Sequence, residues 1–393
     1  MLDFYQHRVS TRIVGGSPGY LAHAAPELEN WRGLRAGIVM DEAIRRIGIY
    51  ETLRPSLEEV GIETVAMFHE VPQDSDLTVV AQAADIFRDA GCQLIIAIGG
   101  GSVMDTAKAV NIVLTHGGDL RDYQGAQVLV QPLLPLLAVP TTVGTGSEVT
   151  MVSVIVDRAD HRKLTFVDTS LAPDLAMLDP AVTFTLPIPL VAATAMDALT
   201  HALEAFIDLE HSPFSDAWAV AAAQSIRENL LPALQVENFE EARANLQMAS
   251  TMAGIAFNHS MVGVVHALAH ALGGVAGVPH GTANALMLVE GLRCNRQVAA
   301  DRIAQIGVRA GFVSHAAEDD ETAGRVIDAI AAFRDEISRA AGLPRSLTAA
   351  GVQRSQLPLL IERASEDGSM VYNPKYVELD EIEQMYLNAM EER

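Results

Sequence analysis

The first half of the chain alternates short apolar runs with segments of helical periodicity. Buried strands bounded by turn residues are predicted at residues 36–40, 64–68, 94–98 and 135–139. Helices are predicted at residues 77–90 and 102–114, and a hairpin at residues 151–156 and 164–167 around a polar turn. This alternation predicts a mostly parallel sheet with helices on both faces.

From residue 186 onward the pattern changes to Ala- and Leu-rich segments, none of which has the features of a strand. Helices are predicted over residues 189–209, 215–231, 239–257, 262–272, 282–293 and 298–310. Pro187 and Pro189 lie at the change, where proline suits a helix start. We therefore predict two domains, an α/β domain over residues 1–185 and an all-helical domain over residues 186–393.

Composition indicates a globular protein, with 49% hydrophobic and 20% charged residues among 393. The formal net charge of −23 argues against nucleic acid or an anionic membrane surface as the main partner. The two cysteines, Cys92 and Cys294, form no metal or disulfide pattern. The most apolar run, residues 128–139, is too short and too rich in proline to span a bilayer, and no signal-peptide pattern opens the chain. We expect a cytoplasmic protein.

The second half carries one carboxylate and three imidazoles at spacings that suit a single divalent metal. Asp197 and His201 are four residues apart and share one face of a predicted helix. His266 and His280 follow in apolar helical sequence, where burial without a shared partner would be costly. A single histidine is more often an isolated core or surface residue, but four such residues favour a metal site that is open on the substrate side.

Two glycine-rich loops follow predicted strands. Residues 99–102, Gly-Gly-Gly-Ser, open a helix, so backbone N–H groups and the positive helix end can bind an anion. A tight strand-to-helix turn, with Ser102 and Asp105 as a capping box, is the alternative. The second loop, residues 140–150, offers hydroxyl and amide groups to a ribose or pyrophosphate, and both loops fit the rule that ligands bind at strand carboxyl ends.

Asp41 directly follows the strand at residues 36–40. A carboxylate there can accept hydrogen bonds from both adenosine ribose hydroxyls and would repel a 2′-phosphate, which favours NAD over NADP. The alternative is a helix N-cap with Glu42 behind it.

Taken together, these motifs resemble the iron-containing (group III) alcohol dehydrogenase family over nearly the full length. The matching segments are residues 10–13, 99–102 with Asp105 and Lys108, 140–148, 197–204, 263–270, 279–281 and 373–374. The resemblance implies a dehydroquinate synthase-like fold, with an N-terminal dinucleotide-binding domain, a C-terminal helical domain and a catalytic metal in the cleft between them.

The resemblance also implies roles for single residues. The family's metal ligands match Asp197, His201, His266 and His280, and a further family histidine near the nicotinamide and substrate matches His270, expected to be catalytic or merely a supporting core residue. The positions that match cofactor contacts are Asp41, Gly100, Gly101, Ser102, Thr141, Thr142, Thr150 and Lys163.

Three segments depart from the family pattern. Residues 15–18 replace an aromatic-then-glycine turn, and Pro72-Gln73-Asp74 stands where Pro-Asn-Pro is common, which puts one nicotinamide-side contact in doubt. His259 occupies a position usually filled by Asn. None of these departures falls on the metal set.

The expected reaction is reversible hydride transfer between a primary alcohol or diol and NAD, with the metal as Lewis acid on the substrate oxygen. Ligand type allows several divalent metals, and the resemblance favours Fe(II), with Zn(II) as an alternative. Alternative functions are a glycerol dehydrogenase-like enzyme, a dehydroquinate synthase-like lyase, or a non-catalytic binding protein. A homo-oligomer, a dimer or larger, is expected.

Overall fold

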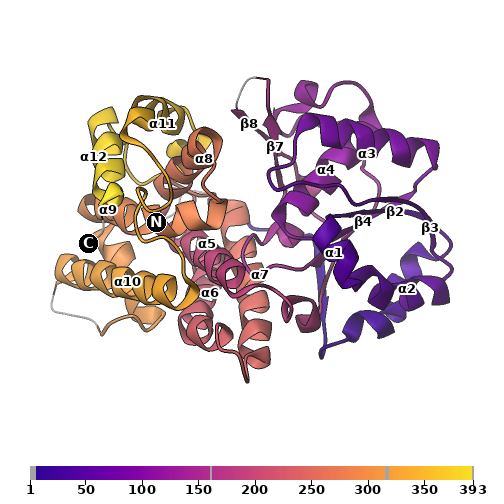
Figure 1. The fold of residues 1–393 in the computed structure, drawn as a ribbon, viewed down its shortest axis with the longest axis horizontal. Coiled ribbons are helices and arrows are strands. Elements are labelled where there is room, and N and C mark those ends of the chain that lie inside the picture. The colour runs from indigo at the N-terminus through magenta and orange to yellow at the C-terminus, as the bar shows by residue number, and fades with distance from the viewer. Residues whose placement is uncertain (1–5, 160–161, 315–317, 392–393) are drawn as a thin grey trace. The chain divides into compact units, whose positions relative to one another are not determined.

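The protein, seen here as a computed structural model, is described over residues 6–159, 162–314 and 318–391 (Figure 1). It divides into two compact units. The α/β unit comprises Val9–Thr142 and Gly146–Thr185. The helical unit comprises the described residues of Leu186–Arg393, together with Val143–Thr145 and the described residues before Val9.

Six parallel strands form one sheet in the described part of the α/β unit, in the order β1-β9-β6-β4-β2-β3. The four predicted strands are confirmed as β2 (Arg35–Met40), β3 (Glu63–Phe68), β4 (Leu94–Gly99) and β6 (Leu136–Pro140). Two short strands at one edge, β1 (Arg12–Gly15) and β9 (Leu175–Leu178), were not predicted. The parallel sheet and the helical second half confirm the predicted fold class.

Helices cover both faces of this sheet, as a parallel sheet requires. In β4, Ile95 and Ala97 pack in the core shared with α3 (Leu77–Asp89) and α4 (Gly101–His116). The alternate residues of β4, Ile96 and Ile98, pack with side chains of α2 (Ile49–Glu59). Figure 1 shows α3 and α4 on one side of β2 and β4, with α2 and the short α1 (Glu42–Ile47) on the other. Burial of each of these isoleucine side chains contributes about 1.5–3 kcal/mol.

The predicted hairpin is confirmed as antiparallel strands β7 (Val152–Asp157) and β8 (Arg162–Val167), beside which β5 (Gly125–Ala126) runs parallel to β8. The hairpin residues 160 and 161 lie outside the described ranges.

The strand order reverses between β2 and β4. From β2 the chain continues outward to β3, whereas from β4 it continues to β6 on the opposite side. The register pairs Met40 with Ile98 and Gly99 with Pro140. The carboxyl ends of β2, β4 and β6 therefore meet at the switch point, where ligands of open α/β sheets bind.

The second unit is helical throughout its described elements. Its α-helices are α5 (Ile188–Ile207), α6 (Pro213–Ala233), α7 (Glu240–Ser260), α8 (Val264–Ala276), α9 (His280–Arg309), α10 (Asp319–Ala341), α11 (Leu357–Ser365) and α12 (Leu379–Met390). Among described helices, α5 is the one that is long and apolar enough by itself to cross a membrane, and 89% of its apolar window is buried within the protein; α7 and α8 meet the same criterion only together, as a pair bent by 104°. Helix α5 is the core helix of the unit, packed between α6, α7 and α9.

The two helices predicted at residues 282–293 and 298–310 both lie in α9, where two helices meet at a kink; the break falls at Ala299 rather than at residues 294–297. The helix has a kink at Ala299, where φ is −127° and ψ is 27°. Asn295, just before the kink, is buried and hydrogen-bonds with Asn373 at 2.8 Å.

Candidate metal centre

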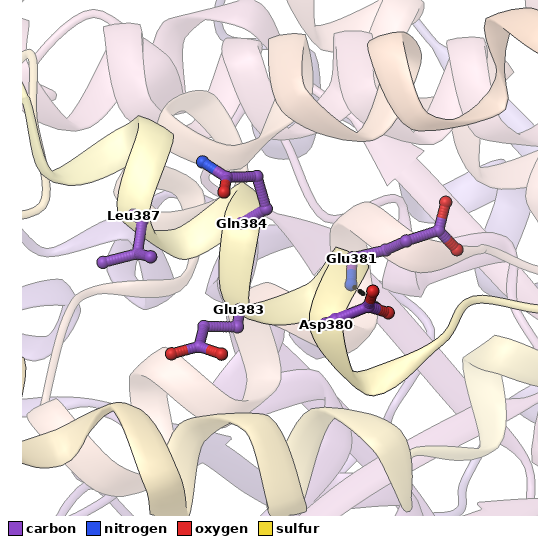
Figure 2. A pocket seen from close by; sticks show the side chains of 5 residues that line it. All are labelled: Asp380, Glu381, Glu383, Gln384 and Leu387. Atoms are coloured by element: carbon purple, nitrogen blue, oxygen red, sulfur yellow. Dashed lines mark hydrogen bonds between the residues drawn. The ribbon is translucent and has the colours of Figure 1, made fainter.

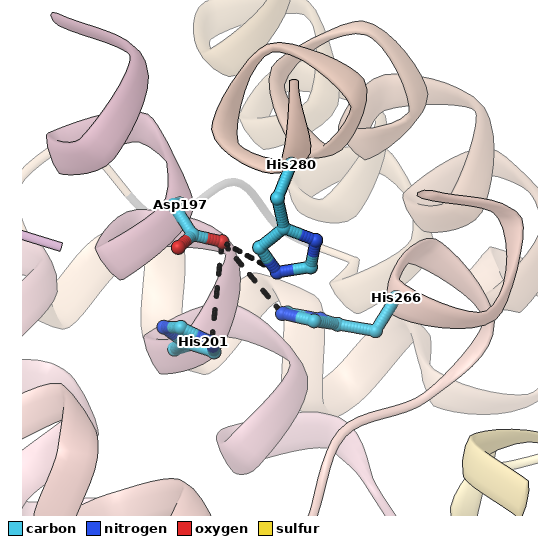
Figure 3. Close-up of side chains that lie close together, drawn as sticks. All are labelled: Asp197, His201, His266 and His280. Carbon is cyan, nitrogen blue, oxygen red and sulfur yellow. Dashed lines mark ion pairs between the residues drawn. The ribbon is translucent and has the colours of Figure 1, made fainter. Parts of the chain in front are cut away.

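The helical unit brings the four predicted ligands together. One potential ligand atom from each of Asp197, His201, His266 and His280 lies within 4.8 Å of all the others. Figure 3 shows the imidazoles directed at the Asp197 carboxylate, with Asp197 and His201 on α5, His266 on α8 and His280 at the first turn of α9.

Local sequence explains how three helices meet closely enough. Asp197 and His201 are one turn apart on α5. Gly281 follows His280, and a Cβ atom there would lie only 2.4 Å from the carbonyl oxygen of Ala193 on α5. Glycine at this position lets the start of α9 lie directly against α5.

The distances fit a small divalent ion. From Asp197 Oδ1, the Nε2 atoms of His280, His266 and His201 lie at 3.5, 3.8 and 3.9 Å. A tetrahedral ion with ligand bonds of ~2.0–2.2 Å separates neighbouring ligand atoms by roughly 3.3–3.6 Å, so a slight contraction would suffice. Three of the residues are buried, whereas the His280 side chain is 32% exposed, which leaves one side of the cluster open to a substrate.

The electrostatics of the cluster favour metal binding over protonation at His201. Burial, and next the neighbouring His266, lower the pKa of His201 well below its ordinary value. A neutral imidazole at neutral pH leaves a ring lone pair available to an ion.

Glu204 supports His266 from behind, a role that the sequence reasoning did not assign. Its Oε2 lies 2.5 Å from His266 Nδ1, and its Oε1 accepts the backbone N–H of Val265 at 2.7 Å. Burial lowers the pKa of His266, but the Glu204 charge and hydrogen bond outweigh burial and raise it. The carboxylate fixes the tautomer with hydrogen on Nδ1, so Nε2 faces Asp197 with its lone pair. Glu204 is three residues after His201 on the same face of α5, which was the available signal.

Asp208 continues the buried acidic face of α5. It is 0% exposed, and its carboxyl oxygens have no hydrogen-bond partner among the described residues. Burial, and next the Glu204 charge, raise the pKa of Asp208 well above its ordinary value. Burial therefore favours the protonated form of Asp208 in the folded protein.

His270 lies beside the cluster but outside the four-ligand set. Its ring stacks on His280 with centroids 5.4 Å apart, and its Nδ1 lies 2.9 Å from Asp367 Oδ2. Burial opposes ionisation of Asp367, but His270 and the Ser369 hydrogen bonds lower the pKa of that carboxyl well below its usual range. Asp367 was missed because it is distant in sequence.

The last turns of α7 also reach the cluster. Phe257 stacks on His201 with ring centroids 4.2 Å apart. His259, the departure from the usual Asn, accepts the backbone N–H of Arg8 at 3.0 Å, so it holds the N-terminal segment of the same unit.

The predicted phosphate loop lies at the switch point of the α/β unit. Gly100 is the N-cap of α4, and a Cβ there would lie 2.8 Å from Cγ2 of Thr142. Close approach of the two glycine-rich loops therefore requires glycine. Gly101 is the first residue of α4, and the Thr141 N–H donates to Gly99 O, which joins the loops.

The alternative capping box of Ser102 and Asp105 is wrong. Helix α4 begins at Gly101, and the Ser102 hydroxyl instead accepts the Asp74 N–H at 3.2 Å. Asp105 is half-buried, and it accepts the Ser147 hydroxyl at 3.0 Å and the Val154 N–H at 3.2 Å. Burial raises its pKa despite Lys108 nearby.

Lys108 holds the second loop from beneath. It is fully buried, and its Nζ contacts the carbonyl oxygens of Ser147, Thr150 and Val152 at 2.8–2.9 Å, and the hydroxyls of Ser147 and Thr150 at 2.9 and 3.1 Å. Burial lowers the pKa of Lys108 to about 8. The ammonium group of Lys108 therefore fixes Thr150. From the sequence, Lys108 is identified only as part of a family motif.

Two further predicted cofactor residues of the α/β unit, Asp41 and Lys163, contact other residues of that unit. Asp41 caps α1, since its Oδ1 accepts the Ile44 N–H at 2.8 Å, as the alternative interpretation expected. Lys163 pairs with Asp74 Oδ1 at 3.2 Å, and Asp74 adopts a positive φ of 53°. Asp74, which departs from the family pattern, therefore hydrogen-bonds to Ser102 and forms an ion pair with Lys163.

A separate pocket lies on α12 (Figure 2). It is lined by Asp380, Glu381, Glu383, Gln384 and Leu387, none of which belongs to the predicted site or contacts the metal cluster. Glu381 is paired with Lys375. We assign this pocket no role.

The α/β unit has glycine-rich loops at the switch point of a parallel sheet, and the helical unit has a carboxylate–histidine cluster. These two features together are those of a metal-dependent oxidoreductase. The sequence matches the description "Iron-containing alcohol dehydrogenase" over residues 10–180, and "Fe-containing alcohol dehydrogenase family, C-terminal" over residues 191–390. The chain belongs to the iron-containing alcohol dehydrogenase family and is an alcohol oxidoreductase.

Individual relatives agree. The chain is 36% identical to 1,3-propanediol dehydrogenase of Citrobacter freundii, over 91% of this chain and 92% of that protein. It is 33% identical to NAD-dependent methanol dehydrogenase of Bacillus methanolicus, over 95% and 96% of the two chains. A crystal structure of 1,3-propanediol oxidoreductase superposes with a TM-score of 0.92 at 34% identity, covering 98% of this chain and all of the other.

Proposed function

We propose that this protein is a metal-dependent, NAD-linked alcohol dehydrogenase and aldehyde reductase that acts on a primary alcohol or diol. The observation that carries the proposal is the convergence of four ligand atoms within 4.8 Å in a chain of this family. The names of its relatives, a propanediol dehydrogenase and an NAD-dependent methanol dehydrogenase, support the substrate class and the cofactor.

Asp197, His201, His266 and His280 would hold the ion. A divalent ion bound there supplies a Lewis acid for an alcohol or carbonyl oxygen. One carboxylate and three neutral imidazoles leave the site with a net charge near +1. The donor set accepts Fe(II), which family membership favours, and also Zn(II).

His270 is the proposed catalytic histidine. Because the Asp367 carboxylate can only accept, Nδ1 of His270 carries a hydrogen, and in the neutral ring Nε2 is the acceptor. We assign Nε2 the hydroxyl proton that leaves the alcohol when hydride is transferred to C4 of the nicotinamide.

The α/β unit would bind the cofactor at its switch point. The N-terminus of α4, at Gly100, Gly101 and Ser102, would hold the pyrophosphate. Thr141, Thr142, Thr150 and Lys163 would hold the nicotinamide side, and Asp41 the adenosine ribose. The cytoplasmic location and the homo-oligomeric state stay predictions.

A panel of alcohols and aldehydes, assayed with NAD and with NADP after anaerobic Fe(II) loading, tests the function. Steady NADH formation with a simple primary alcohol or diol is expected. A dehydroquinate synthase-like lyase would give no net NADH, and oxidation of glycerol alone would favour the glycerol dehydrogenase alternative. His280→Ala should abolish turnover and metal retention while NADH still binds, and His211→Ala, outside the cluster, should retain metal. Wild-type turnover after His280→Ala would overturn the ligand assignment.

A further inference from the structure

Asn284 is a fifth side chain at the metal cluster. It lies one turn after His280 on α9 and is fully buried. Its Nδ2 is 2.5 Å from Asp197 Oδ1, and 3.2 Å from Nε2 of both His266 and His280. The amide nitrogen therefore lies over the face formed by three of the four ligand atoms.

The two ends of this carboxamide have unequal partners. The amide group directs two N–H donors at three lone pairs. In contrast, Oδ1 is buried and has no hydrogen-bond partner among the described residues. A buried carbonyl oxygen without a partner costs free energy, so this orientation is stabilised by the acceptors facing Nδ2.

These lone pairs are the ones that a divalent ion would use. Amide hydrogens carry positive partial charge, so N–H bonds aimed at the cluster oppose a bound cation, whereas a carbonyl oxygen attracts one. Half a turn about the Cβ–Cγ bond exchanges NH₂ for oxygen with almost no change of shape.

We propose that Asn284 belongs to the metal site: its NH₂ group holds the ligand atoms together before the ion binds, and its Oδ1 faces the ion afterwards. This inference rests on the proposed metal site. The proposal explains why Oδ1 of Asn284 has no hydrogen-bond partner among the described residues, although Nδ2 of the same side chain contacts three ligand atoms. Carboxamide oxygen is a suitable donor for Fe(II) and adds no charge to the site.

The test uses Co(II) as the probe metal in the full-length protein. Asn284→Leu keeps the approximate shape but removes both polar ends, and Asn284→Asp supplies an oxygen. Asn111→Leu, which removes a buried carboxamide of α4 in the other unit, is the matched control. Metal affinity is measured by chelator competition, and coordination by the visible absorption of bound Co(II), which strengthens as the coordination number falls.

The leucine variant should bind Co(II) about 10–100-fold more weakly, with stronger visible bands than wild type. Asn284→Asp should keep the affinity and the weak bands, and Asn111→Leu should change neither. Wild-type affinity in the leucine variant, or weaker binding with an unchanged spectrum, would overturn the proposal. If wild type itself binds no Co(II), the metal site fails instead. If the leucine variant does not fold, Asn284→Ala is read by the same criteria.

Discussion

Glu204 Oε2 lies 2.5 Å from Nδ1 of His266, while Oε1 of the same carboxylate accepts the backbone N–H of Val265 at 2.7 Å. One buried side chain thus accepts two N–H groups at the start of α8 and sets which nitrogen of His266 faces the metal ligands. A carboxylate can do this because both of its oxygens accept.

Glu204→Gln keeps the shape but has only one acceptor oxygen. Either an N–H then faces another N–H, or His266 changes tautomer and directs a hydrogen into the metal site. We expect metal affinity to fall about 10–100-fold, measured by chelator competition. Glu290→Gln, at another buried glutamate of the unit, is the control. Equal affinities in wild type and Glu204→Gln would show that the tautomer is set elsewhere.

Lys108→Met keeps the length of the side chain but leaves three carbonyl oxygens without their donor and Asp105 without its counter-charge. Removal of one partner from a buried charged network costs about 3–5 kcal/mol. We expect a matching loss in urea unfolding and weaker NADH binding, with metal content unchanged because the cluster lies in the other unit. Undiminished NADH binding would refute the role assigned to this lysine.

Asp208→Asn tests the raised pKa of Asp208 on α5. The folded-state pKa of Asp208 is raised, so folding takes up a proton at any pH between about 3.8 and that raised value. Wild-type stability should therefore decline with rising pH in this window, by about 1.4 kcal/mol per pH unit from this group. Asparagine needs no proton, so the melting temperature of the variant should exceed that of wild type by a margin that grows as the pH rises from about 3.8 toward the raised pKa. Parallel pH profiles would mean that Asp208 is ionised in the folded protein.

Asp41 has a capping role in the structure and a proposed ribose role, and two variants separate them. Asp41→Ser keeps a cap for α1, whereas Asp41→Ala loses about 1 kcal/mol of stability. Both should lose preference for NAD over NADP, because both remove the charge that would repel a 2′-phosphate. The ratio of kcat/KM for the two cofactors measures this. An unchanged ratio in both variants would leave Asp41 as a cap alone.

The sequence predicted those elements whose burial is visible in their composition. Strand β4 is an uninterrupted apolar run because both of its faces are covered. Strand β1 was missed because it is a four-residue edge strand whose residues are mostly exposed. The break in α9 was predicted at residues 294–297, but it falls at Ala299, because the buried Asn295 hydrogen-bonds with the distant Asn373 from within the helix.

The same limit applies to the site. Helical spacing pairs Asp197 with His201, but no local pattern shows that Glu204 and Asn284 contact His266, since those contacts join three helices. The capping box at Ser102 was wrong because Asp105 reaches Ser147 and Val154 instead of the helix start. Local sequence indicated the chemistry, and tertiary contacts determined the partners.

Anomalous diffraction on both sides of the iron absorption edge, from crystals grown anaerobically with Fe(II), is the most direct test of the central claim. We predict one peak about 2.0–2.3 Å from Asp197 Oδ1 and the Nε2 atoms of His201, His266 and His280. Active protein with no anomalous peak among these four side chains would contradict it.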